Sequence, residues 1–138
     1  MASLQSCRQA VPEMRRPLFT IALLLSISAT PALAVDRFSS GTNAYSTGLY
    51  SAAARHWMGL AEKGHGPAQY NIGRMFYYGQ GVARDPVEAY KWFLLANNSG
   101  VKRSRDASEM LGDKLTSRQI AEATIRAREW GYRNAGAR

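Results

Sequence analysis

Tyrosine and arginine share one side of a helical segment in the middle of the chain. Tyr70, Arg74 and Tyr77 are four and three residues apart, which aligns them along one side of an α-helix, away from the apolar side of Ala68 and Ile72. These two residue types carry binding energy at interfaces more often than most, since each combines a broad contact surface with polar groups. The spacing therefore predicts a binding surface.

The residues that could carry catalysis lack the spacing that catalysis needs. His56 and His65 lie nine residues apart, and no nearby carboxylate motif completes a metal-ligand pattern. The sequence has no nucleophile elbow and no ordered Ser-His-Asp triad. The segment Gly79-Gln80-Gly81 is similar to a fragment of a phosphate-binding loop, but it joins two helical segments instead of a strand and a helix. We therefore predict no catalytic residue, no cofactor and no metal.

One enzymatic alternative stays open. The acidic residues of the C-terminal half have the spacing of solvated helix faces, yet a carboxylate pair for general acid and base chemistry is compatible with them: Glu88, Asp106, Glu109 and Asp113. A hydrolase with an unrecognised carboxylate site is thus a second hypothesis. Loss of turnover on replacement of Glu109 or Asp113 would support it.

The chain is basic, with a formal net charge of +8, of which +6 remains in the part after Ala34. This balance favours anionic partners, although a basic surface also simply keeps a protein soluble. The densest run is Lys102-Arg103-Ser104-Arg105, within a connector expected over residues 101–106. Near an anionic surface each such residue contributes roughly 1 kcal/mol. The third hypothesis is therefore a basic accessory module for an anionic cell-envelope polymer or lipid.

The first 34 residues have the three parts of a secretory signal peptide. An arginine pair supplies the charge, residues 18–27 are apolar, and a small-residue site ends at Ala34. The apolar run is shorter than the about 20 residues that span a bilayer, so no transmembrane span is expected. Cys7, the only cysteine, lies in this segment. We predict cleavage after Ala34, a start at Met1 or Met14, and a periplasmic or secreted protein without nucleic-acid partners.

The rest of the chain is predicted to be helical. After a leader or linker over residues 35–44, apolar spacing predicts helices over residues 45–63, 67–78, 86–98, 104–114 and 117–130. We place a helical domain over residues 45–133 and a tail over residues 134–138. The last two helices are expected to turn these residues inward: Ala107, Met110, Leu111, Ile120, Ala123, Ala127 and Trp130.

Capping residues mark the helix boundaries. Gly64 and Gly131 are expected to end helices, since glycine adopts the left-handed C-terminal conformation without strain. Asp85 is a good N-cap, and Thr116 with Gln119 forms a capping box.

Helix pairs recur along the sequence. The spacing of Ala54, Trp57 and Ala61 recurs 35 residues later, and residues 68–73 are echoed more weakly after 39 residues. Such a period indicates stacked helix pairs, none of which buries its apolar face alone. Gly73 lies inside a predicted helix, where glycine costs about 1 kcal/mol against alanine. We therefore expect a neighbouring helix to approach it closely.

These motifs resemble the Sel-one-like repeat (SLR), an α/α relative of the tetratricopeptide repeat. The resemblance rests on Ala61-Glu62-Lys63-Gly64, on the segment from Ala68 to Val82, and on Asp85 with Ala89-x-x-Trp92-x-x-x-Ala96. It implies a short all-α solenoid of about two repeats and a C-terminal capping helix. The repeat-defining residues would be Trp57, Ala61, Gly64, Ala68, Gly73, Phe76, Gly79, Gly81, Asp85, Ala89, Trp92 and Ala96.

The resemblance also implies a function. Proteins of this family are interaction scaffolds, often exported in bacteria, and in tetratricopeptide-like stacks the first helix of each unit lines a groove. Tyr70, Arg74 and Tyr77 would then face the groove, joined by Glu109 and Asp113 of the next unit. Our leading hypothesis is a non-catalytic exported scaffold that binds a protein or peptide in a shallow groove. Because two repeats and a cap are near the minimum for a stable stack, a dimer or a larger assembly would complete the core.

Overall fold

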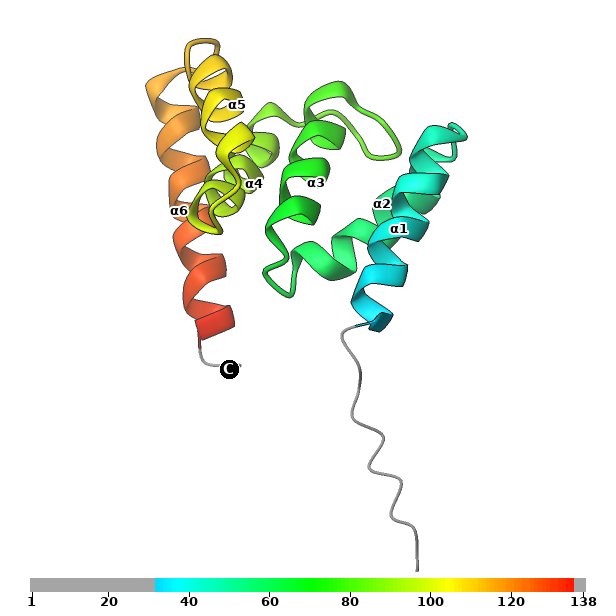
Figure 1. Cartoon of the computed structure of the whole chain (residues 1–138). Helices are drawn as coiled ribbons and strands as arrows, with labels where there is room; N and C mark the ends of the chain where they lie inside the picture. The colour runs from blue at the N-terminus through cyan, green and yellow to red at the C-terminus, as the bar shows by residue number, and fades with distance from the viewer. Residues whose placement is uncertain (1–31, 136–138) are drawn as a thin grey trace, which may run out of the picture.

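The computed structural model describes residues 32–135 of the chain. Within this range the chain forms six α-helices and no strand: α1 (Ala32–Ser46), α2 (Tyr50–Ala61), α3 (Gly66–Tyr78), α4 (Pro86–Asn98), α5 (Lys102–Gly112) and α6 (Ser117–Ala135). Figure 1 shows α1 and α2 at one end of the array, α5 and α6 at the other, and α3 and α4 between them. The predicted all-α fold is confirmed.

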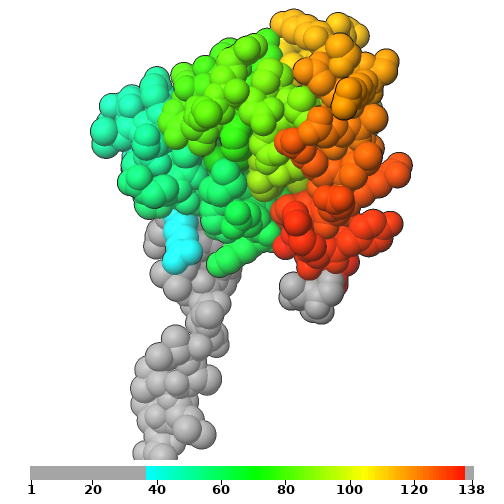
Figure 2. Space-filling model, turned by 180° about the vertical axis from the view of Figure 1, so that it is seen from behind, coloured from blue at the N-terminus to red at the C-terminus, as the bar shows by residue number. Residues whose placement is uncertain are grey.

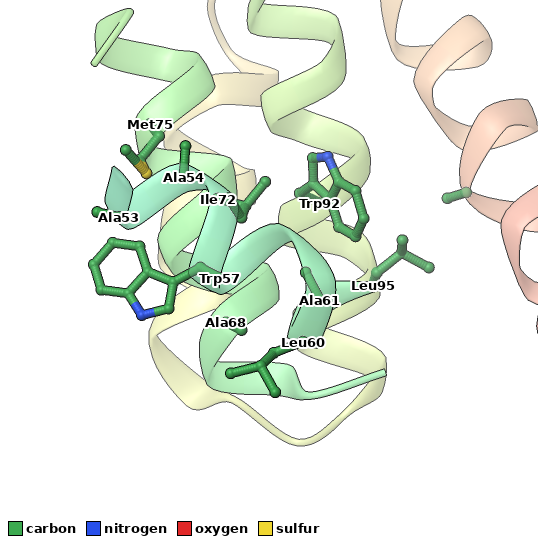
Figure 3. Packing of buried hydrophobic residues seen from close by; sticks show 11 residues of the cluster. Ala53, Ala54, Trp57, Leu60, Ala61, Ala68, Ile72, Met75, Trp92 and Leu95 are labelled. Carbon is green, nitrogen blue, oxygen red and sulfur yellow. The ribbon is translucent and has the colours of Figure 1, made fainter. Parts of the chain in front are cut away.

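Each helix packs on its neighbour in the chain, from α1 to α5, and α6 returns to pack on α4. The main core lies between α2, α3 and α4, where Trp57, Ile72 and Trp92 lie among buried alanines and larger apolar side chains (Figure 3). A second cluster joins α4 to α5 through Phe93 and Leu111. Each large apolar side chain buried in this way stabilises the fold by roughly 1.5–3 kcal/mol.

The ends of α3 and α4 lie close to where the sequence predicted them. The Asp85 carboxylate accepts hydrogen bonds from the backbone N–H groups of Val87 and Glu88, both at 3.0 Å. At the end of α3, Gly79 has a φ of 71°, the left-handed conformation that other residues adopt only with strain. The repeat-defining alanines are all fully buried, which lets the helix axes approach each other: Ala61, Ala68, Ala89 and Ala96.

The expected linker over residues 35–44 is wrong, because this segment belongs to α1. The reason is tertiary contact rather than local sequence. Trp57 Nε1 of α2 donates to the backbone oxygen of Phe38 at 3.3 Å, and the Phe38 ring lies 5.2 Å from the His65 ring. Gly48, with a φ of 78°, forms a turn between α1 and α2 and thus splits the helix expected over residues 45–63.

The predictions for the C-terminal helices also need correction. The basic run is not a connector, because α5 begins at Lys102 and Ser104 is already buried inside it. Met110 was expected to face inward but is 44% exposed. Gly131 does not end the last helix, since α6 continues through it to Ala135. The predicted capping box is confirmed, with the Thr116 N–H donating to the Gln119 side chain at 2.9 Å.

Most of the predicted signal peptide, residues 1–31, lies outside the described residues, as do residues 136–138 of the predicted tail. The predicted cleavage site after Ala34 falls within the bounds of α1. Across residues 32–135, none of the helices has the length and apolar character required for a membrane span.

Candidate binding groove

A groove of about 450 Å³ lies between α3 and α5, and we call it the α3/α5 groove. Phe93 of α4 also contributes to its wall. The side chains that line it come from two helix faces: Tyr70, Arg74, Tyr77 and Tyr78 of α3, and Arg103, Asp106, Ala107 and Met110 of α5. All three residues of the predicted tyrosine–arginine surface therefore open into one groove.

The α3 side of the groove is held in place by contacts with three other parts of the chain. The Tyr70 ring lies 5.8 Å from the Phe93 ring. The Arg74 guanidinium lies 5.8 Å from the centre of the Tyr45 ring of α1. Lys114, just beyond α5, donates to Tyr77 Oη at 3.0 Å. These contacts orient side chains that would otherwise move freely on a helix surface.

The α5 side of the groove differs from the prediction. Glu109 and Asp113 were expected to face it, but they are not among its lining residues. The face of α5 that meets α3 instead carries residues at the spacing i, i+3, i+4 and i+7, namely Arg103, Asp106, Ala107 and Met110. Glu109 is about a third of a turn away from this face, and Asp113 lies past the last residue of the helix.

The charges in the α3/α5 groove are unbalanced. Arg74 and Arg103 have no carboxylate within 4.0 Å among the described residues, and Asp106 has no cation within that distance. Lys114 adds a third cation beside Tyr77. The groove therefore combines aromatic surface with an excess of positive charge.

The described residues include no group of three His, Cys, Asp or Glu side chains that could hold a metal ion. His56 is exposed on α2. His65 caps α3, since its Nδ1 accepts a hydrogen bond from the Ala68 N–H at 3.2 Å. His56 is thus a surface residue, whereas His65 stabilises the N-terminus of α3.

A larger hollow of about 720 Å³ lies between α4 and α6, and we call it the α4/α6 groove. Its walls include Leu94, Leu95, Ala127 and Trp130, with Asn98 and Asn134 among its polar residues. Figure 2 shows α6 from behind, in orange and red, beside α4 at the edge of the array. This groove was not predicted from the sequence. The continuous apolar run of residues 92–95 was the available signal, because it gives α4 a second apolar side.

An ion-pair network also joins α6 to α4, through residues that do not line the α4/α6 groove. Arg126 donates to Glu122 of its own helix at 2.5 Å and to Glu88 of α4 at 3.2 Å, and Glu88 also pairs with Lys91. Burial lowers the pKa of Arg126, but Glu122 and Glu88 outweigh that effect and the pKa is raised overall. Arg126 thus forms an i, i+4 pair within α6 and at the same time links this helix to α4.

Helix pairs packed side by side, with a groove between the first helices of adjacent pairs, define a short α/α solenoid. The family model for the Sel1 repeat matches residues 66–101, which comprise α3, α4 and the loop between them. The chain thus carries a Sel1-like repeat, as the motifs predicted. Sel1-like repeats generally mediate protein–protein interactions.

Two curated relatives and one solved structure are similar to this chain. An exopolysaccharide production negative regulator of Rhizobium meliloti is 34% identical over 65 residues, 47% of this chain and 24% of its own length. The ERAD-associated E3 ubiquitin-protein ligase component HRD3A of Arabidopsis thaliana is 43% identical over 54 residues, 38% of this chain and 8% of its own length.

The solved structure is a protective antigen of uropathogenic Escherichia coli that displays an SLR fold. It is 29% identical, with a TM-score of 0.64 over 70% of this chain and 22% of that chain. The chain therefore spans a quarter or less of the length of each of these relatives.

Proposed function

We propose that the chain is an exported, non-catalytic binding module that holds a segment of a partner protein in the α3/α5 groove. The observation that carries this proposal is the convergence of Tyr70, Arg74 and Tyr77 on one groove, where their rings and guanidinium are oriented by packing. Preorganised aromatic and arginine side chains lose little entropy on binding, which makes them suitable anchors. Export rests on the signal-peptide pattern of the first 34 residues.

The size of the groove favours a short segment over a folded surface. A volume of about 450 Å³ accommodates a few side chains. Its lining combines the buried Phe93 ring and the half-buried Ala107 with two cations, Arg74 and the exposed Arg103. An apolar centre with a polar rim is the usual anatomy of a specific protein-binding site.

Selection of peptides from a random library on the full chain tests this proposal. We expect selected peptides to lose about tenfold or more in affinity for Tyr77→Ala and Arg74→Ala, since anchor residues contribute roughly 2 kcal/mol each. Tyr132→Ala and Arg118→Ala are the matched controls, because both side chains are exposed on α6 and are not groove-lining residues. Peptides that bind all four variants equally would contradict the proposal. Circular dichroism establishes that each variant is folded.

A specific observation favours a second candidate, the basic accessory module. Lys102, Arg103 and Arg105 are exposed in the first two turns of α5, and none has an ion-pair partner among the described residues. A bound anionic polymer should be released steeply as salt increases, whereas a peptide anchored by tyrosine rings should not. Dextran sulfate binding, titrated from 50 to 500 mM NaCl, tests this candidate. If the chain binds dextran sulfate and no peptide is selected from the library, the basic accessory module is favoured over the peptide groove.

A further inference from the structure

The polar groups of the α3/α5 groove are mostly hydrogen-bond donors. Arg74 and Arg103 each present a guanidinium with five N–H donors and no acceptor, and neither is paired with a carboxylate. The hydroxyl groups of Tyr70 and Tyr78 have no hydrogen-bond partner within the described part of the chain, and Tyr78 is 59% exposed. Asp106 is the only carboxylate among the lining residues.

The cations are distributed along the groove rather than gathered at one end. Arg103 lies in the first turn of α5, Arg74 lies in the middle of α3, and Lys114 contacts Tyr77 near the end of α3. Lys114 Nζ also lies 5.6 Å from the centre of the Tyr77 ring, which keeps its charge beside the groove. A ligand lying along α3 would therefore meet positive charge at successive positions.

A ligand that satisfies this groove must be rich in acceptors and must also have apolar groups. Carboxylates accept charge-assisted, often bidentate hydrogen bonds from arginine, about twice as strong as neutral ones. In the same groove, Ala107, Met110 and the tyrosine rings provide apolar and aromatic surface. An extended acidic peptide meets both requirements, because its carboxylates alternate with side chains that can pack on the rings.

We propose that the partner segment bound in the α3/α5 groove is acidic, with aspartate or glutamate side chains paired to Arg74 and Arg103. This inference rests on the proposed function, because it names the chemistry of the segment that the groove would hold.

Peptide selection separates this inference from the proposed function. We expect the peptides selected from a random library on the full chain to be enriched in Asp and Glu. One selected peptide is then synthesised in two forms, the original acidic form and an amide form in which Asp and Glu are changed to Asn and Gln. Fluorescence anisotropy measures the affinity of the chain for each form. The amide form should bind about tenfold or more weakly.

Charge-removing variants locate the binding. Arg74→Gln and Arg103→Gln should each lower the affinity for the acidic peptide by about tenfold and leave the affinity for the amide form nearly unchanged. Arg105→Gln is the matched control, because Arg105 lies on the same helix but does not line the groove. Equal loss in Arg105→Gln would overturn the inference by assigning the effect to general attraction by a basic surface.

The outcomes of the selection differ in what they contradict. Neutral or basic peptides that still depend on Tyr77 would overturn the acidic-partner inference and leave the proposed function standing. If no peptide is selected, both fail. In that case, binding to dextran sulfate would indicate that the basic residues of the groove bind an anionic polymer, and binding to phosphatidylglycerol vesicles would indicate a lipid surface.

Discussion

Phe93 packs its ring directly on the backbone of Gly73. A Cβ added to Gly73 would lie 2.6 Å from Phe93 Cε1, closer than two carbon atoms can approach without displacement. This contact brings α3 and α4 together and places Phe93 in the wall of the α3/α5 groove. The predicted close approach at this glycine is thus confirmed, and the glycine helps to position the candidate site.

Replacing Gly73 by alanine should destabilise the protein. The added methyl group overlaps a side chain that is 2% exposed and has little room to move, so we expect a loss of about 1–3 kcal/mol in the free energy of unfolding. Urea denaturation measures it. Gly131→Ala is the control, because a Cβ there meets nothing within 4 Å, and it should stabilise α6 by up to about 1 kcal/mol. Equal effects of the two changes would contradict the packing argument.

The attachment of α1 should depend on Gly41. A Cβ on this glycine would overlap the Trp57 indole, whose N–H donates to Phe38. Gly41→Leu should therefore displace α1 from α2. Hydrogen exchange followed by mass spectrometry should show lost protection of α1 amides while α4 amides remain protected. The same substitution at Gly59, an open position of α2, serves as the control. Unchanged exchange in α1 would mean that this helix does not need the tryptophan contact.

Two glycines with the same backbone conformation should respond differently to alanine. Gly81 and Gly100 both have positive φ angles, 71° and 83°. A Cβ on Gly81 would overlap the backbone of Tyr50, whereas one on Gly100 meets nothing within 4 Å. Backbone strain alone costs about 1 kcal/mol, so Gly100→Ala should lose about that much and Gly81→Ala clearly more. Thermal unfolding of the two variants tests this difference. A smaller loss for Gly81→Ala would show that the loop moves away from Tyr50 at little cost.

The central pair, α3 and α4, could be predicted from the sequence because its signals are local. Asp85 caps α4 by contacting residues two and three positions further on, and Gly79 ends α3 by its own conformation. Helix capping and apolar spacing involve residues that are only a few positions apart, so they can be recognised in the sequence. For the same reason the helical spacing of Tyr70, Arg74 and Tyr77 correctly placed them on one face.

The flanking helices could not be predicted in the same way. The sequence of α1 is rich in small and polar residues, and the helix is held by contacts with Trp57, nineteen residues after Phe38. Likewise, Gly131 is a residue type that commonly ends helices, but α6 continues past it. The α5 side of the groove was misassigned because Glu109 and Asp113 were placed there from the resemblance to repeat stacks, whereas a different face of α5, which includes Arg103, lines the groove. Such features depend on contacts that local patterns do not contain.

The ion-pair network between α4 and α6 should contribute modestly to stability. Arg126→Gln removes the pairs with Glu122 and Glu88, and because the Arg126 side chain is 39% exposed we expect a loss of only about 0.5–1 kcal/mol. Arg118→Gln is the control, since Arg118 is exposed on α6 without an ion-pair partner among the described residues. Solvent screening should reduce the Arg126 effect further in 0.5 M NaCl.

The pH dependence of this effect has a definite sign. The pKa of Arg126 is raised in the folded protein, so its contribution to stability is fully present below the pKa of the unfolded chain and is lost only as pH rises through the folded value. Both lie far above neutral pH, because an arginine side chain stays protonated there. The stability difference between the parent and Arg126→Gln should therefore be constant from pH 7 to pH 9, as measured by urea denaturation. A difference that changes within this range would show that another titrating group controls how α6 packs on α4.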